Sequence, residues 1–344
     1  MGNRNSCSSP KKSKRYQLPK TTIHEGEYNV PDGPCYGVGL TPDSRILVTT
    51  HDNSIKYWDL KTKRVIYTIE RAHHSTIYSL TMSNNGTTFI TGSKGNTVKI
   101  WSVDKPQELH KFKNITENCV FEVKLTNDNN YFLARCGYEE EAHVQFWNIR
   151  KKSLIKSFPL GNALCIAIAP NDEIFACSSW SEIKVWDLRT KELVSQMRLI
   201  DTSVIIRSLV FTNDGEKIIT GSNAWLKIWD VGSGNLIHTI EHQSKLPLTL
   251  LKMLDDETMI SASDDGVIGI WNIEEKRLID SFVHNENFKI RSRYQDPKPR
   301  ITFSASKDKK TLVTASNEGL IKIWDLPSRK CVHTLFTPRI TDDS

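Results

Sequence analysis

The heptapeptide SIKYWDL at residues 54–60 recurs six more times along the chain, with conservative changes. The other copies are TVKIWSV (97–103), HVQFWNI (143–149), EIKVWDL (182–188), WLKIWDV (225–231), VIGIWNI (267–273) and LIKIWDL (320–326). Their tryptophans are Trp58, Trp101, Trp147, Trp186, Trp229, Trp271 and Trp324. These tryptophans stand 39 to 53 residues apart, and each copy has the β-branched and aromatic composition of a strand. The chain is therefore built from seven copies of one unit.

Each unit contains more than the tryptophan strand. A turn rich in Asn, Asp, Gly and Pro lies upstream of every copy, such as TPDS (41–44) and TNDG (212–215), with an apolar run before it and a second strand after it. Another strand follows each tryptophan, for example LIHTIE (236–241). Four strands per unit and seven units predict an all-β fold, a seven-bladed β-propeller of four-stranded antiparallel blades.

Residues 35–337 resemble the WD40-repeat family in repeat number and spacing. The resemblance implies a hydrogen-bonded tetrad of His, Ser or Thr, Asp and Trp in each blade. The Asp six residues before the tryptophan is present only as Asp52 and Asp265, and no Gly-His pair occurs. We expect one complete tetrad, formed by His242, Ser263, Asp265 and Trp271, and we expect apolar packing between blades to supply most of the stability.

The ends of the chain raise the question of how the ring closes. Residues 331–337 form a fourth strand for the last blade, which would leave residues 21–34 as a linker. The alternative pairs residues 21–25 at the outer edge of that blade. We favour the first arrangement, with a disordered basic tail at 1–20 and a short tail at 338–344.

Charge and motif content exclude several classes of function. Six of the 46 basic side chains lie in residues 1–24, which contain no acid, so the remainder is balanced at 40 bases and 40 acids. A neutral body lacks the electrostatic footprint of a nucleic-acid binder. No HExxH, GxSxG, GxGxxG or P-loop motif is present, and the seven cysteines show no CxxC spacing. We expect no enzyme activity, no cofactor and no metal, in a reducing compartment.

Two tryptophans fall outside the repeat positions. Trp180 and Trp225 lie between the second and third strands of consecutive blades, and Tyr138 holds the matching place one blade earlier, beside the acidic run 139–141. The resemblance to WD40 propellers implies that these turns open on the face used for partners. Aromatic anchors are common at binding hot spots, so these residues are candidate contacts. The alternative is that both indoles fill space on neighbouring strands.

The longest spacing, before the last blade, contains the basic segment 285–300 with Arg291 and Arg293. It fits a loop that contacts an acidic partner or a phosphate, or else a solvated insertion.

The first residues fit an acylation signal. Met1 to Ser6 match M-G-x-x-x-S/T, the pattern for N-myristoylation of Gly2, and Cys7 could take a second acyl chain. A basic cluster at residues 11–15 follows. One myristoyl chain binds membranes weakly, so a second chain or basic residues are needed for stable attachment to an anionic membrane surface.

Together these features predict a non-catalytic WD-repeat scaffold or adaptor, a monomeric propeller within a larger complex, tethered to the cytoplasmic face of a membrane. The alternative is a soluble adaptor or substrate-recognition subunit whose tail is only a linker. The partners are proteins that the sequence does not name, since one fold hosts many functions.

Overall fold

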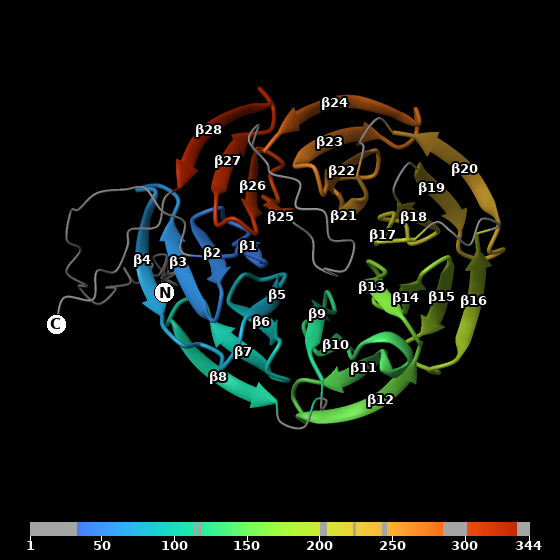
Figure 1. The fold of residues 1–344 in the computed structure, drawn as a ribbon, viewed down its shortest axis with the longest axis horizontal. Coiled ribbons are helices and arrows are strands. Elements are labelled where there is room, and N and C mark those ends of the chain that lie inside the picture. Colours follow the sequence, from blue (N-terminus) through green and yellow to red (C-terminus); the bar gives the residue numbers. More distant parts are fainter. Residues whose placement is uncertain are drawn as a thin grey trace, which may run out of the picture.

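Each repeat forms one four-stranded antiparallel sheet, and seven such sheets surround a central axis in the computed structural model (Figure 1). The structure describes residues 33–112, 115, 118–199, 205–222, 225–242, 246–284 and 301–335. Strands pair in chain order within every sheet, so each sheet is a simple meander. The predicted seven-bladed propeller is confirmed, and we number its blades 1 to 7 in chain order.

The strands of the seven blades occupy four concentric positions. The innermost strands are β1 (Val38–Leu40), β5 (Ile77–Met82), β9 (Val120–Leu125), β13 (Ala163–Ile168), β17 (Ser208–Phe211), β21 (Leu248–Met253) and β25 (Ile301–Ala305). The second strands are β2 (Ile46–His51), β6 (Thr88–Ser93), β10 (Tyr131–Cys136), β14 (Ile174–Ser179), β18 (Lys217–Gly221), β22 (Thr258–Ser263) and β26 (Thr311–Ser316).

The third strands carry the repeat tryptophans, and the fourth form the rim. The third strands are β3 (Ser54–Asp59), β7 (Val98–Ser102), β11 (His143–Asn148), β15 (Glu182–Asp187), β19 (Trp225–Asp230), β23 (Val267–Asn272) and β27 (Ile321–Asp325). The outer strands are β4 (Arg64–Ile69), β8 (Gln107–Phe112), β12 (Ser153–Pro159), β16 (Leu193–Arg198), β20 (Leu236–Glu241), β24 (Arg277–Val283) and β28 (Lys330–Leu335). A 3₁₀ turn, η1 (Glu139–Glu141), joins β10 to β11.

The apolar core is divided among the interfaces between blades. Seven clusters of buried hydrophobic side chains each join residues of two neighbouring blades, and together they cover every interface of the ring. Both faces of most strands are therefore buried, which explains their nearly continuous apolar sequences. Every repeat tryptophan packs into the cluster shared with the preceding blade, as Trp101 does with blade 1. Packing between blades thus holds the ring together.

Blades 7 and 1 meet through the same kind of interface. Val38 and Trp58 of blade 1 share a cluster with Val313 and Ile323 of blade 7, and the Leu40 amide donates to the Ser304 hydroxyl at 3.2 Å. The outer strand of blade 7 is β28, which pairs with β27. Its fourth strand therefore comes from the C-terminal side of the chain, whereas the alternative at residues 21–25 lies outside the described residues.

Polar turns connect the blades at the end of the ring where first and second strands join. The Asn84 side chain donates to Asn127, and the Asn127 amide donates to Asp172 at 2.7 Å, so blades 2, 3 and 4 are linked in sequence. Lys307 of blade 7 donates to the Asn84 carbonyl at 2.9 Å. Since Asn and Asp also form the turns themselves, the same residue types build both features.

Six of the seven repeat indoles donate a hydrogen bond to a side chain within their own blade. The acceptors are Thr49 for Trp58, Thr91 for Trp101, Gln145 for Trp147, Thr220 for Trp229, Ser261 for Trp271 and Thr314 for Trp324. The seventh, Trp186, has a buried Nε1 without a hydrogen-bond partner among the described residues. In the second strand, the residue two positions after the one paired with the tryptophan is Thr or Ser in five blades. It is Ala134 in blade 3 and Cys177 in blade 4.

The predicted tetrad in blade 6 is wrong. Trp271 donates to Ser261, whereas Ser263 bonds Asp265, and His242 lies 3.2 Å from the Ser222 carbonyl. Longer networks occur in other blades. His73 bridges Thr91 and Thr97 in blade 2, and His284 lies 2.7 Å from the Thr314 hydroxyl in blade 7. The position of the expected aspartate in blade 2 is Gly95, and the Thr97 hydroxyl contacts His73 instead, since a hydroxyl can also accept from imidazole.

Candidate partner-binding face

One end of the ring is formed by the turns between second and third strands together with the connections between blades; we call it the loop face. Backbone hydrogen bonds tie the two sets of loops together. The Ile206 amide donates to the Trp180 carbonyl at 2.8 Å, and the Asn162 amide donates to the Glu139 carbonyl at 2.6 Å. Residues of neighbouring blades therefore lie on one connected surface, as the resemblance had implied.

The innermost strands begin on this face, and several of them share an irregularity at their first residues. In four blades the pairing with the second strand shifts by one residue, which leaves Tyr78, Phe121, Leu164 and Thr249 as extra residues opposite the partner strand. A β-bulge of this kind redirects the side chain of its extra residue. All four side chains line the part of the central channel nearest the loop face, which we call the upper channel. The bulges thus decide which groups surround the channel mouth.

Aromatic rings connect blades 1 to 3 at this mouth; we call them the aromatic arc. The centroids of Tyr36 and Tyr78 lie 6.0 Å apart, those of Tyr78 and Phe121 5.7 Å, and those of Phe121 and Tyr138 4.7 Å. The Tyr138 hydroxyl lies 3.1 Å from the Cys119 sulfur. The arc runs from the half-buried Tyr36 to the exposed Tyr138, so it carries an apolar strip from the channel to the surface.

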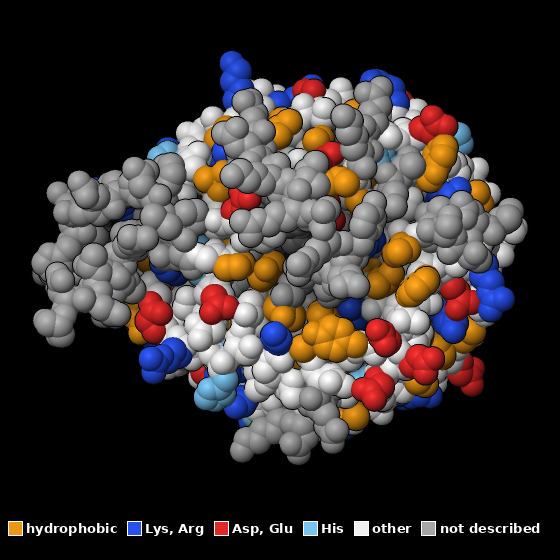
Figure 2. All heavy atoms as spheres, viewed as in Figure 1, with side chains coloured by type: hydrophobic (Ala, Val, Ile, Leu, Met, Phe, Trp, Pro, Cys, Tyr) orange, Lys and Arg blue, Asp and Glu red, His pale blue; other side chains and the backbone are white. Residues whose placement is uncertain are grey.

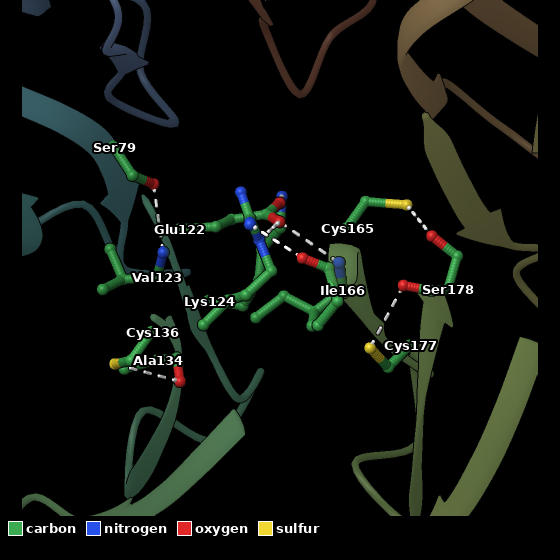
Figure 3. A network of polar contacts seen from close by, with 12 residues as sticks. Ser79, Glu122, Val123, Lys124, Ala134, Cys136, Cys165, Ile166, Cys177 and Ser178 are labelled. Atoms are coloured by element: carbon green, nitrogen blue, oxygen red, sulfur yellow. Dashed lines mark hydrogen bonds and ion pairs between the residues drawn. The ribbon is translucent and has the colours of Figure 1, made fainter. Parts of the chain in front are cut away.

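A polar network lies beside the arc, between blades 3 and 4 (Figure 3). Glu122 of β9 accepts from the Ile166 amide at 3.1 Å and forms ion pairs with Lys124 at 3.2 Å and Arg135 at 3.6 Å. The Arg135 guanidinium also donates to the Ala163 carbonyl at 3.0 Å and stacks 4.9 Å from the Phe121 ring centre. Each charge of Glu122 and Arg135 is therefore compensated within the fold, which orients both side chains rigidly.

Two of the three predicted aromatic contacts are exposed. Trp180 is 53% exposed and Tyr138 is 47% exposed. Trp225 is half-buried, and it is the first residue of β19, paired with Glu241, so its predicted place in the turn is wrong. The structure joins Tyr138 to the arc but gives Trp180 a separate cavity, lined also by Asn162, Glu182 and Arg198.

Backbone conformation fixes the two exposed aromatics. Gly137 has φ +79°, and a Cβ there would lie 2.6 Å from the Glu141 carbonyl oxygen, so only glycine fits the turn that presents Tyr138. Trp180 has φ +40°, a left-handed conformation that a bulky side chain rarely adopts. Such strain persists where the surrounding structure imposes it, and it often marks functional positions.

Acidic side chains accompany the exposed aromatics. Glu139, Glu140 and Glu141 of η1 are all exposed, directly after Tyr138. Figure 2 shows hydrophobic side chains gathered over β9 and β10, with acidic side chains beside them toward β12. This part of the loop face therefore combines apolar surface with negative charge.

Other predicted site residues lie outside the described residues. They are Gly2 and Cys7, the tail 1–20, and Arg291 and Arg293 of the segment 285–300. The described part of the chain has no helix long and apolar enough to cross a bilayer.

Sequence reasoning missed the inner part of the aromatic arc. Tyr36, Tyr78 and Phe121 stand at one position of three successive repeats, in CYGVGL (35–40), IYSLTM (77–82) and VFEVKL (120–125). Aligning the first strands of the repeats would have shown this column of aromatic residues. The bulges that direct Tyr78 and Phe121 to the channel could not be seen in the sequence.

Comparison with known proteins agrees with this architecture. The family model "WD domain, G-beta repeat" matches residues 23–59, 63–102 and 196–230. These three stretches are WD40 repeats, and the whole chain resembles the WD40-repeat propellers. The match covers three stretches, which contain the tryptophan strands of blades 1, 2 and 5.

Relatives of this WD40-repeat chain are distant and differ in length. Cilia- and flagella-associated protein 52 of Sus scrofa is 24% identical over 257 residues, 70% of this chain and 39% of the relative. Guanine nucleotide-binding protein subunit beta-like protein 1 of Mus musculus is 26% identical over 159 residues, 45% of this chain and 48% of the relative. The chain thus spans less than half of both. A WD repeat domain-containing protein 83 homolog of Dictyostelium discoideum is 23% identical over 332 residues, 93% of this chain and 90% of the relative.

Proposed function

We propose that this chain is a non-catalytic WD-repeat scaffold that binds protein partners through Tyr138 and Trp180 on the loop face. One observation carries the proposal. Tyr138 and Trp180 are the two aromatic residues among the large hydrophobic side chains that are exposed in the described part of the chain. The others, such as Leu193 and Val332, all lie on outer strands. Exposed aromatics on a rigid surface are typical anchors of protein interfaces.

The chemistry of this region favours a partner segment that is basic and partly apolar. Glu139 to Glu141 would attract positive charge, and an Arg or Lys side chain could stack on the Trp180 ring. The exposed Tyr138 ring, which packs on the buried Phe121, offers apolar surface beside these charges. Because Gly137 and the hydrogen-bonded loops hold the region rigid, a partner would lose little free energy in ordering it.

The test compares proteins captured from cell extract by two double variants. We expect Tyr138→Ala/Trp180→Ala to lose about tenfold or more of a partner's recovery, the usual range for hot-spot aromatics. Leu193→Ala/Val194→Ala removes equally exposed apolar surface from outer strand β16 and should keep the partners. Trp225→Ala tests the third candidate separately. Identical partner sets for wild type and the first variant would refute the proposed surface.

We further propose that the N-terminus tethers the propeller to the cytoplasmic face of a membrane. Gly2 in its acylation pattern, Cys7 beside it, and the basic residues 11–15 support this role. Two acyl chains, or one chain with a basic patch, give stable attachment where one chain does not. Phosphorylation of Ser8, Ser9 or Ser13 would add negative charge among the lysines and weaken the attachment.

Fatty-acid labelling and fractionation test the tether. Wild type should incorporate a myristate analogue and sediment with membranes, Gly2→Ala should do neither, and Cys7→Ser should keep the label yet become more soluble. Asn3→Ala serves as the matched tail variant, because it changes a position that the acylation pattern leaves open. Unlabelled, non-sedimenting wild type would leave the soluble adaptor as the correct description.

A further inference from the structure

The upper part of the central channel contains a cavity of about 160 Å³. All seven blades contribute to its wall, from Tyr36 and Tyr78 in blades 1 and 2 to Arg207, Thr249 and Thr302 in blades 5, 6 and 7. A single water needs only ~10–15 Å³ by a comparable measure, so the cavity can hold a larger group. It adjoins the aromatic arc but does not include Trp180 or Tyr138.

Polar atoms without partners are concentrated in this wall. Among the described residues eight buried side-chain nitrogen or oxygen atoms lack a hydrogen-bond partner, and three of them line the cavity: Arg207 Nε, Thr249 Oγ1 and Arg135 Nε, the last of which is held only by its ion pair with Glu122 at 3.6 Å. Burying an unpaired donor is costly, and native folds rarely retain several together without a reason. All three atoms can donate, which points to a ligand made of acceptors.

Positive charge in the channel exceeds negative charge. Glu122 is already paired with Lys124 and Arg135. Arg207 has no ion pair with any described residue, nor does Lys252, which lines the adjoining chamber of the channel. Lys252 is accessible from the channel, and desolvation by the surrounding wall together with the nearby charge of Lys124 lowers its pKa to about 8. An anion bound in the channel would relieve the repulsion between Lys124 and Lys252.

We propose that the upper channel binds a phosphate group through Arg207, Arg135 and Thr249. A phosphate has only acceptor atoms, arranged tetrahedrally, so it can receive hydrogen bonds from three blades at once. Guanidinium groups match its geometry and charge better than ammonium groups do. The rings of Tyr36, Tyr78 and Phe121 form an apolar wall for whatever bears the phosphate. Neither Tyr138 nor Trp180 lines this cavity, and the Phe121 ring, which packs on Tyr138, separates it from the proposed docking surface.

The test uses the full chain and two phosphate sources. Inorganic pyrophosphate stands for a free phosphate compound, and a short phosphoserine peptide stands for a phosphorylated protein segment, with the unphosphorylated peptide as its control. Binding is measured by calorimetry at physiological ionic strength. The variant Arg207→Gln/Thr249→Val removes the two donors that make no other side-chain hydrogen bond in the described structure. Arg189→Gln/Thr334→Val makes the same changes on an outer turn and on β28.

We expect wild type and the outer variant to bind at least one phosphate source, and the channel variant to bind it at least about tenfold more weakly, since charge-assisted hydrogen bonds are lost. Thermal unfolding of the free proteins verifies that both variants are folded. Absence of binding by wild type to either source would overturn the proposal. Equal loss in both variants would also overturn it, because it would indicate only general attraction to a basic surface.

Discussion

The indole N–H of Trp101 donates a hydrogen bond of 2.8 Å to the hydroxyl oxygen of Thr91. The same oxygen lies 2.7 Å from Nε2 of His73, whose Nδ1 lies 2.7 Å from the Thr97 hydroxyl. These contacts join His73, in the connection from blade 1, to Thr91 of β6 and Trp101 of β7. All four residues of the network are buried or half-buried. Blade 2 thus holds a polar network that apolar packing surrounds on both sides.

Thr91→Val should destabilise the protein by ~2–4 kcal/mol, because it leaves both the Trp101 indole and the His73 ring without their buried partner. The measurement is the free energy of unfolding in urea. Thr334→Val makes the same change at a half-buried position on outer strand β28 and should have an effect below ~0.5 kcal/mol. Equal effects of both variants would show that the network contributes nothing beyond packing.

Cys177→Ser should stabilise blade 4 by about 1 kcal/mol, because a hydroxyl at this position would accept from the unpaired Trp186 Nε1 as Ser261 does from Trp271. The control is Cys136→Ser, also in a buried second strand, where the tryptophan of the blade already donates to Gln145. That change should destabilise the protein, since it buries a polar hydroxyl where no indole is left to donate to it. A loss of stability in both variants would contradict the prediction.

Stability should fall as the pH is lowered from about 6.5 toward 4. Burial lowers the pKa of His73 to about 3 and that of His284 to about 4, with Lys99 and Lys322 respectively as the next causes. The unfolded chain binds these protons near pH 6.5 while the native chain does not, so each histidine removes about 1.4 kcal/mol per pH unit in this window. Urea unfolding at several pH values measures the slope.

Two variants check the origin of that slope. His73→Gln and His284→Gln should each flatten it by about one proton. Carboxylates affect stability at lower pH than the histidines do. Hydrogen bonds from the Ser306 hydroxyl and the Lys310 amide lower the pKa of Asp308. The stability that this carboxylate contributes is therefore lost only as the pH falls through the lowered pKa. An unchanged slope between pH 6 and 4 in both variants would exclude the histidines as its source.

Trp180→Gly should be more stable than Trp180→Ala by about 1 kcal/mol, because φ is +40° and glycine alone adopts this region without strain. The difference in thermal unfolding between the two variants measures the strain that the native tryptophan maintains. The matched pair Leu193→Gly and Leu193→Ala, on regular strand β16, should show the opposite order. The same order in both pairs would remove strain as the explanation.

The sequence by itself determined the number of blades and the order of strands, since a strand pattern repeated seven times can bury its apolar faces only against neighbouring copies. It also identified Tyr138 and Trp180 as aromatics outside the repeat. It failed for the polar network, because it assigned Ser263 to a tetrad although Ser261 accepts from the indole. The two serines lie two residues apart on one face of β22, and the register against β23 decides which of them the indole reaches. The channel site depends on tertiary structure alone. Arg135, Arg207 and Thr249 are distant in sequence, and only the closing of the ring and the bulge at Thr249 bring their donors to one cavity.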